Sequence, residues 1–210
     1  MYLSRLTLNI GSAWARRTLK NRYELHQTIL KAFPDHDLES YRKLPSKERI
    51  LYRIEPHPKT QLPSILIQSP NEPGWNFLTS SSYLAGPPEL MEFSILDIPK
   101  GSVFKFKLFG NPTKRKNGKR IGLHENEMDQ FNWLIKKGQQ NGFKIRTADI
   151  TNKMTVRTQR PKETHNIICF GVEYEGILEV IDPEKFEDVL KSGLGSGKGF
   201  GFGFLTIYLR

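Results

Sequence analysis

The order of predicted strands and helices is the feature that most restricts the fold of this chain. Near the N-terminus, Leu6, Leu8 and Ile10 alternate with polar residues, which is typical of a half-buried strand. A helical stretch, two short strand candidates, a weak helix and a last strand candidate follow. The predicted elements of this first half span 2–10, 16–33, 50–54, 64–68, 76–84 and 90–98.

The same order of elements then occurs a second time. Residues 103–109 alternate as in a strand, and Phe131 and Leu134 belong to an apolar stripe at helical spacing. Asp182 is a predicted N-cap, with Pro183 at the first position of another helix. The predicted elements of this second half span 103–109, 126–139, 143–150, 167–181, 183–191 and 204–209.

Each half therefore runs strand, helix, strand, strand, helix, strand, which is the order of a ferredoxin-like or RRM-like βαββαβ domain. We predict an α+β protein of two tandem ferredoxin-like domains, 1–99 and 100–210, with the boundary near Lys100 and Gly101. The second half fits the order better, because 76–84 makes a poor helix. Many unrelated functions occur on this topology, so function has to be argued from the site residues.

The charge of the chain favours a polyanion as its partner. The 210 residues include 32 Lys and Arg against 22 Asp and Glu, a formal net charge of +10. The cations gather in 16–22, 42–53, 114–120 and 153–162, with neutral or acidic stretches between them. Separate clusters favour a folded basic surface over a basic tail, although charge runs also occur simply as solvated faces.

Composition argues against a membrane or secreted protein. No run reaches the ~18 consecutive apolar residues of a membrane span, and the first residues enter a strand pattern without a signal-peptide core. Cys169 is the only cysteine, which excludes an internal disulfide and a zinc site built from several thiolates. We therefore expect a cytoplasmic protein without membrane contact.

We expect no metal or other cofactor. Glu125, Glu127 and Asp129 lie at the start of a predicted helix, where carboxylates interact favourably with the helix dipole. We assign them to that role and not to a metal cluster. The group 35–37, Asp-His-Asp, is turn-like and has no distant ligand to complete a metal site.

The strongest candidate for chemistry is the helical stretch 16–33. Tyr23 and His26 stand three residues apart and can meet over one helical turn, beside a predicted buried stripe of Leu25, Ile29 and Phe33. The cations around this pair are Arg16, Arg17, Lys20, Arg22 and Lys31. An imidazole and a phenol among cations suit proton transfer on a phosphate. The alternative is that the histidine and tyrosine have only structural roles.

A glycine-rich stretch precedes the last predicted strand. Gly193 to Gly203 contains six glycines in eleven positions, together with Lys198. Glycine lets backbone N–H groups approach a phosphate closely. This is not a Walker loop, because it lacks the Gly-Lys-Ser/Thr ending and leads into a strand instead of a helix. The stretch is also explained as a tight connection between a helix and a strand.

Two more basic segments are candidates for nucleic-acid contact. Segment 110–120 holds five cations around turn residues, and these could grip phosphates: Lys114, Arg115, Lys116, Lys119 and Arg120. Segment 153–162, with Arg157, Arg160 and Lys162, lies between two strand candidates as a basic hairpin thin enough to enter a groove. Entry into A-form RNA would be easiest near a helix end. Both segments are equally well explained as exposed charged loops.

Four local motifs occur in one order along the chain. The first follows the opening strand, the second is a turn, the third is a helix that runs into a Gly-Phe pair, and the fourth is the glycine pattern. They are Arg16-Arg17 with Tyr23-Glu24-Leu25-His26, Asn111-Pro112-Thr113-Lys114, Trp133-Leu134 with Gly142-Phe143, and Gly193-Leu194-Gly195 with Gly201-Phe202-Gly203. Over essentially its full length, the chain resembles the CasE family, the type I-E CRISPR-associated endoribonucleases of the RAMP superfamily that process precursor crRNA.

The resemblance implies two tandem ferredoxin-like domains and a particular reaction. Enzymes of the family cleave each CRISPR repeat at the 3′ base of its stem-loop without a metal ion, leaving a cyclic phosphate and a 5′-hydroxyl. They then stay on the crRNA as a subunit of the Cascade surveillance complex. The implied partners are therefore the CRISPR repeat RNA stem-loop and the other Cascade subunits.

The resemblance also implies roles for individual residues. His26 would be the general acid or base, Tyr23 would position or activate the attacking 2′-hydroxyl, and Lys31 would stabilise the phosphorane charge. Arg157 and Arg160 would lie in a hairpin that grips the RNA stem. The chain departs from the family pattern through additional glycines at positions 197 and 199.

Two other classes of function stay open. A non-catalytic RAMP-type RNA-binding subunit would share the fold, with Tyr23 and His26 only stacking on RNA or bonding to it. A structural basic protein, such as a ribosome-associated one, would contact RNA backbone alone. Cleavage of RNA separates the endoribonuclease from the non-catalytic subunit. A preference for stem-loops over random duplex separates both of these from the structural basic protein.

Overall fold

The computed structural model describes residues 1–33, 49–95, 97–159 and 167–208. The chain divides into two compact units. Unit 1 consists of Met1–Ser94, Arg157–Ile167 and Gly199–Gly201, and unit 2 of Ile95–Val156, Ile168–Lys198 and Phe202–Arg210. Unit 1 therefore includes two short segments from the second half of the sequence.

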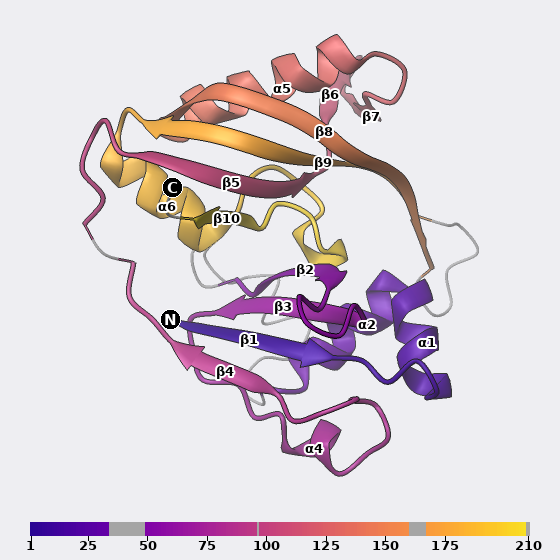
Figure 1. Cartoon of the computed structure of the whole chain (residues 1–210). Coiled ribbons are helices and arrows are strands. Elements are labelled where there is room, and N and C mark those ends of the chain that lie inside the picture. Colours follow the sequence, from indigo (N-terminus) through magenta and orange to yellow (C-terminus); the bar gives the residue numbers. More distant parts are fainter. Residues whose placement is uncertain (34–48, 96, 160–166, 209–210) are drawn as a thin grey trace. The chain divides into compact units, whose positions relative to one another are not determined.

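The described residues of unit 1 form one four-stranded sheet and three helices. The strands are β1 (Tyr2–Thr7), β2 (Leu51–Pro56), β3 (Pro63–Ser69) and β4 (Glu89–Glu92). The helices are α1 (Ala13–Lys20), α2 (Arg22–Leu30) and the short α4 (Asn76–Thr79). The strand order is β2-β3-β1-β4, and every adjacent pair is antiparallel (Figure 1).

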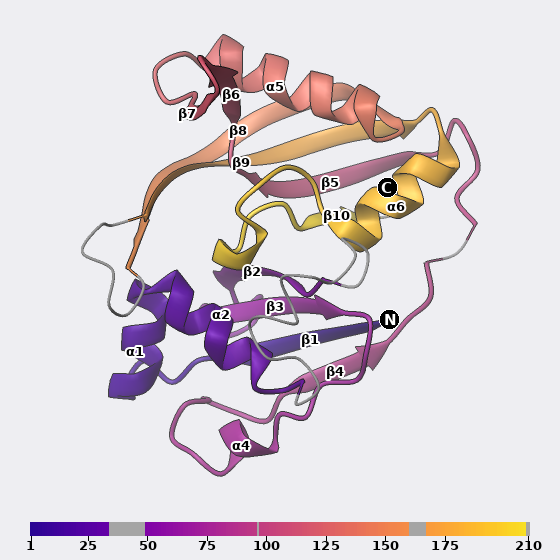
Figure 2. The same cartoon turned by 180° about the vertical axis from the view of Figure 1, so that it is seen from behind.

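The core of unit 1 lies between α2 and one face of this sheet. One cluster joins Ile29 of α2 to four sheet-side residues that are at most 1% exposed. These are Leu6 of β1, Leu8 just after β1, and Ile65 and Ile67 of β3. Strand residues two apart point to the same face, so these positions define the face that the helix covers. Figure 2 shows α2 over the sheet on that side.

The helical stretch predicted over 16–33 is two helices, divided at Asn21. The Asn21 backbone is extended, with φ −118° and ψ 99°, and its side-chain oxygen accepts a hydrogen bond from the Tyr23 N–H at 3.1 Å. Asparagine favours such an N-cap over a helix interior, because its side chain replaces a backbone partner. The predicted burial of Leu25, Ile29 and Phe33 is confirmed, although Phe33 lies beyond the end of α2.

Other elements of unit 1 are shorter than the sequence predicts. The first strand ends at Thr7, and Ile10 is 52% exposed beyond it. The weak helix predicted over 76–84 is reduced to the four residues of α4. The strand predicted over 90–98 is only β4, whose residues are exposed, since it pairs with β1 at the edge of the sheet.

The described residues of unit 2 form a second four-stranded sheet, a separate hairpin and two α-helices. The sheet strands are β5 (Val103–Gly110), β8 (Phe143–Thr158), β9 (Ile167–Val180) and β10 (Leu205–Tyr208), in the order β10-β5-β9-β8. The hairpin strands β6 (Thr113–Lys116) and β7 (Lys119–Gly122) pair with each other. The helices are α5 (Glu127–Gln140) and α6 (Pro183–Ser192). A 3₁₀ turn follows at Lys198–Phe200, of which Lys198 belongs to unit 2 and Gly199 and Phe200 to unit 1.

The helices of unit 2 start at recognisable caps and share one core. Asn126 caps α5, and Asp182 caps α6 by accepting the Lys185 N–H, as predicted. Leu134 of α5 and Phe186 of α6 are fully buried in one cluster with strand residues that point to one face of the sheet. These strand residues are Phe106, Leu108, Val172, Tyr174, Leu178 and Val180.

The two sheets have the same topology. In each, the first and third strands of a βαββαβ set are central and the second and fourth are at the edges. The prediction of two tandem ferredoxin-like folds is therefore confirmed. Within the described ranges, no helix is long and apolar enough to cross a membrane.

Candidate active site

His26 lies on α2 at the centre of a small group of residues within unit 1. Its side chain is on the inner side of the helix, and the residue is 8% exposed. The ring of Tyr52, from β2, lies nearly parallel to the imidazole, with 6.3 Å between ring centroids and 18° between ring planes. A β-carbon at Gly199 would lie 3.4 Å from Cε1 of His26, so the main chain of the glycine-rich stretch passes close to the imidazole.

The hydroxyl of Tyr52 connects the elements around His26. It lies 3.0 Å from the carbonyl oxygen of Gly199 and 3.3 Å from that of Arg22, and its one proton can be donated to either. Tyr52 is fully buried. The start of α2, strand β2 and the glycine-rich stretch are thus joined at one buried phenol.

Tyr23 lies at the start of α2, where the end of β8 is attached. Its N–H donates to Asn21 Oδ1 and also to Thr158 Oγ1, at 3.1 and 3.0 Å. Thr158 in turn donates to Asn21 Oδ1 at 2.6 Å, and Asn21 donates to the carbonyl oxygen of Gln159 at 3.2 Å. Among the described residues, the Tyr23 hydroxyl has one hydrogen-bond partner, the amide of Gln27, which donates to it at 3.5 Å. The chain that enters segment 160–166 is therefore held directly at the candidate tyrosine.

The predicted cations of the helical stretch lie in different surroundings. Arg22 is half-buried, and burial lowers the pKa of its guanidinium, an effect that Tyr52 partly opposes. Arg17 pairs with Glu24 at 2.7 Å, and Arg16 donates to the carbonyl oxygens of Ile10 and Gly11. Arg16 therefore has a local structural role in addition to its charge.

Lys20 and Lys31 are exposed, as Arg16 and Arg17 are. Lys31 is the C-cap residue of α2, and its backbone N–H bonds to the carbonyl oxygen of Gln27 at 3.3 Å. It lies five residues beyond His26, after the last helical residue. The structure thus brings His26 and Tyr23 onto one helix, with Lys31 at its end.

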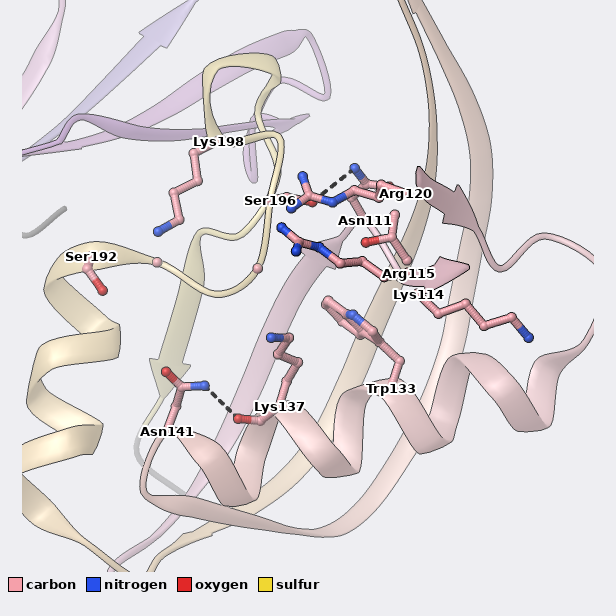
Figure 3. A pocket seen from close by; sticks show the side chains of 13 residues that line it. Asn111, Lys114, Arg115, Arg120, Trp133, Lys137, Asn141, Ser192, Ser196 and Lys198 are labelled. Atoms are coloured by element: carbon pink, nitrogen blue, oxygen red, sulfur yellow. Dashed lines mark hydrogen bonds between the residues drawn. The ribbon is translucent and has the colours of Figure 1, made fainter. Parts of the chain in front are cut away.

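The second set of predicted cations lies on the β6–β7 hairpin of unit 2. Lys114, Arg115, Lys116, Lys119 and Arg120 are all exposed there. Lys114 pairs with Asp129 of α5 at 3.4 Å. Arg115, Arg120 and Lys198 line a common hollow of about 450 Å³ with Lys137, a residue that sequence reasoning did not select (Figure 3).

Segment 153–162 is described only in part. Lys153 to Thr158 continue β8 as a strand, and the Arg157 side chain is exposed. Arg160 and Lys162 lie outside the described residues, as does the Asp-His-Asp group at 35–37. The grip of this hairpin on RNA stays a prediction.

The residues excluded from metal binding have ordinary structural roles where they are described. Glu127 and Asp129 lie in the first turn of α5 and pair with Lys153 and Lys114. Cys169 lies half-buried on β9, and burial raises the pKa of its thiol. A raised pKa makes the reactive thiolate scarce at neutral pH.

Comparison with known proteins identifies the family. A family model described as CRISPR associated protein matches residues 1–208. The chain belongs to this CRISPR-associated protein family. A curated relative, the CRISPR-associated endoribonuclease Cse3 of Thermus thermophilus, is 32% identical over 219 aligned positions that cover 99% of each chain. The resemblance to the CasE type of CRISPR-associated endoribonuclease is thereby confirmed.

Solved structures of this family agree with the fold. A Cse3 endoribonuclease bound to a 19-nucleotide RNA is 32% identical and superposes over 100% of both chains with a TM-score of 0.84. Thermus thermophilus Cse3 bound to an RNA that represents a pre-cleavage complex is 31% identical, with a TM-score of 0.82 over 99% of this chain and 98% of the other. Escherichia coli Cas6e, at 21% identity and a TM-score of 0.67, supports the fold alone.

Proposed function

We propose that the chain is a metal-independent endoribonuclease of precursor crRNA. It binds the CRISPR repeat stem-loop and cuts at the 3′ base of the stem. The observation that carries the proposal is the likeness, over the whole of both chains, to a Cse3 endoribonuclease bound to RNA. The product stays bound, and the protein becomes a subunit of Cascade in the cytoplasm. Residues 1–99 carry the catalytic helix, and 100–210 carry the basic hairpin and the glycine-rich loop.

The proposed reaction needs no external nucleophile. The 2′-oxygen attacks the adjacent phosphorus, the bond from phosphorus to the 5′-oxygen breaks, and a 2′,3′-cyclic phosphate and a 5′-hydroxyl result. One proton leaves the 2′-hydroxyl and one reaches the 5′-oxygen. Because nucleophile and phosphate belong to one molecule, the protein has only to align them, move protons and stabilise charge.

The residues on and beside α2 supply these actions. His26 is the general acid or base, since an imidazole titrates near neutral pH. Tyr23 positions the 2′-hydroxyl with its phenol group, whose oxygen accepts a long hydrogen bond from Gln27. Lys31 stabilises the negative charge on the phosphorane.

The basic residues of both units bind the RNA. Cations neutralise phosphates, and arginine adds a forked donor that suits phosphate and guanine edges. The hairpin that carries Arg157, Arg160 and Lys162 grips the stem. The remaining contacts come from Arg16, Arg17, Lys20, Arg22, Lys114, Arg115, Lys116, Lys119, Arg120 and Lys198.

The test uses a labelled repeat hairpin from the CRISPR locus of this protein in excess EDTA. A second hairpin carries a 2′-deoxy nucleotide at the cut site. We expect one cut in the all-ribose RNA and none in the deoxy RNA, because the deoxy RNA lacks the nucleophile. Cutting of both RNAs would contradict attack by the 2′-hydroxyl.

The second candidate is a non-catalytic RNA-binding subunit of a ribonucleoprotein. The observation that favours it is the low exposure of His26, 8%, which is also usual for a histidine that only supports a helix. Tight binding of both hairpins with no cut in either would establish this candidate in place of the first.

A further inference from the structure

Unit 2 has a hollow on its surface between the β6–β7 hairpin, α5 and the glycine-rich stretch. We call it the basic hollow, and its volume is about 450 Å³. It is lined by Asn111, Thr113, Lys114, Arg115, Arg120, Trp133, Lys137, Asn141, Ser192, Gly193, Gly195, Ser196 and Lys198. Five of these residues are cations that come from four different elements.

Three cations of the basic hollow have no carboxylate partner among the described residues. None of its lining residues within the described ranges is Asp or Glu. Lys114 pairs with Asp129, which lies outside the lining, whereas Arg115, Arg120 and Lys137 form no ion pair with described residues. Figure 3 shows the charged ends of Arg115 and Lys137 pointing into the same space, while Lys114 points away. Like charges gathered in this way repel one another, so an anion between them is stabilised.

The wall of the hollow that belongs to the glycine-rich stretch is firmly held. The Leu194 N–H donates to the carbonyl oxygen of Gly203 at 2.7 Å, and the Gly203 N–H donates to that of Phe109 at 2.8 Å. A β-carbon at Gly195 would lie 3.0 Å from the indole of Trp133, so the loop packs directly on α5. Donors on a wall that is already ordered lose little conformational entropy when a ligand binds.

The lining fits phosphate better than another anion. Besides the cations it offers the hydroxyl groups of Ser192 and Ser196, and a phosphate has enough acceptor oxygens to use such donors together with a guanidinium. The volume exceeds that of one phosphate group and lies within the range of small-ligand sites, so a nucleotide-sized piece of a strand can enter.

A single strand suits the hollow better than a duplex. The backbone of a helical stem is convex and rigid, so its phosphates would meet exposed cations of the hairpin such as Lys116 and Lys119, which do not line the hollow. A flexible strand can bend toward the half-buried Lys137. We therefore propose that the basic hollow binds phosphates of the single-stranded RNA that flanks the stem-loop, an inference that rests on the proposed function.

Lys137 gives the proposal a specific test. It lies half-buried on α5 and lines the hollow, whereas its neighbour Lys136 is exposed and does not. The variants Lys137→Ala and Lys136→Ala remove the same charge from the same helix. Only Lys137→Ala should weaken the binding of a single-stranded flank.

The experiment measures Kd for three RNAs that carry a 2′-deoxy nucleotide at the cut site, so that binding is seen without cleavage. One is the bare stem-loop, and the others have a short oligouridine added at the 5′ or the 3′ end. We expect one extension to tighten binding by the wild type roughly tenfold. In Lys137→Ala this gain should fall, and the slope of log K against log salt should decrease by about 0.7, the value for one single-strand phosphate contact.

Each alternative result is decisive. If neither extension tightens binding by the wild type, or if Lys136→Ala loses as much as Lys137→Ala, the proposal is wrong. If inorganic pyrophosphate alone binds in a Lys137-dependent manner while the extensions add nothing, the hollow takes a free phosphate ligand and not an RNA strand. Cleavage of the all-ribose stem-loop is assayed separately, so failure of the proposed function is distinguished from failure of this inference.

Discussion

The phenol ring of Tyr52 lies nearly parallel to the imidazole of His26, with 6.3 Å between the ring centroids and 18° between the ring planes. The two residues come from β2 and α2. Since the Tyr52 hydroxyl also bonds to Gly199 and can bond to Arg22, the phenol fixes both the backbone beside His26 and one side of its ring. Tyr52 is therefore a positioning residue for the proposed general acid or base.

The substitution Tyr52→Phe removes the hydroxyl and keeps the ring. The loss of a buried hydrogen bond is worth ~0.5–1.5 kcal/mol, so we expect the single-turnover cleavage rate to fall about three- to tenfold. The Kd for RNA should not change. The matched control is Tyr83→Phe, because Tyr83 is also fully buried in unit 1 and bonds to Thr18 at 2.7 Å. If Tyr83→Phe slows cleavage as much, the effect of Tyr52 is one of general stability.

His26→Ala should abolish most of the catalysis and leave the RNA complex intact. Positioned proton transfer typically contributes ~10²–10⁴-fold, and the single-turnover rate should fall by about that factor. Binding should stay within about twofold, since this variant keeps every cation that is proposed to hold the RNA. His57→Ala is the control, because His57 lies in the same unit but bonds to Glu89 at 3.0 Å. A normal cleavage rate in His26→Ala would end the catalytic assignment.

The fold was largely predictable, because its long elements have strong apolar periodicity. Strand β5 and helices α5 and α6 lie within a few residues of their predicted bounds. The break at Asn21 was missed because apolar spacing continues across it, although Asn21 and Glu24 have the spacing of a capping box. The short β6–β7 strands are too uniformly charged to alternate, so only the turn at Asn117-Gly118 marked them.

The candidate site was predictable only where its residues are close in sequence. Tyr23 and His26 share one helix, so their spacing was informative. Tyr52 lies in an apolar strand and looks like any core aromatic, and its approach to His26 depends on tertiary packing. The same holds for Thr158, which bonds to Tyr23 although the two residues are 135 positions apart in the sequence. It also holds for Lys137, because three distant segments of the chain form the hollow that it lines.

Thr158→Val should loosen the attachment of β8 to the start of α2. Thr158 is 3% exposed and makes hydrogen bonds to Tyr23 and Asn21 that valine cannot make. We expect hydrogen exchange at the Tyr23 amide to speed up roughly fivefold, corresponding to ~1 kcal/mol. Thr155→Val, on the exposed part of the same strand, should leave that exchange unchanged. Equal protection in the two variants would show that the contact does not hold the strand end.

Glu55 should make unit 1 sensitive to acid. Burial favours the neutral carboxyl, but Arg53 and Arg5 outweigh it and hold the pKa of Glu55 below its ordinary value. Its Oε2 lies 2.7 Å from Arg53, which is 1% exposed, and its Oε1 lies 2.9 Å from Arg5. The charged carboxylate therefore contributes stability that is complete above the ordinary Glu pKa of about 4.3 and is lost as the pH falls through the lower folded-state pKa.

The substitution Glu55→Gln tests this linkage. It removes the negative charge 2.7 Å from the buried Arg53, and we expect it to lower the free energy of unfolding by about 3 kcal/mol at neutral pH. The difference from the wild type should shrink as both are acidified below about pH 4. Glu89→Gln, an exposed carboxylate 3.9 Å from Arg5, should have little effect at any pH. A Glu55→Gln deficit that stays constant with pH would contradict the assignment.

Gly199→Ala should separate activity from stability. A β-carbon there meets His26 at 3.4 Å from Cε1 and 3.5 Å from Nδ1, an ordinary contact distance, so the fold accepts it. The methyl group would nevertheless occupy space beside the imidazole, and small misplacements at a reacting centre are costly, so we expect cleavage to slow roughly 10- to 100-fold.

Gly203→Ala gives the contrast: φ is +83° and the β-carbon would lie 2.4 Å from the Leu194 carbonyl oxygen. That variant should lower the melting temperature, because a left-handed backbone costs ~1–2 kcal/mol in a residue with a β-carbon. Wild-type cleavage by Gly199→Ala would show that the glycine-rich stretch does not border the reacting phosphate.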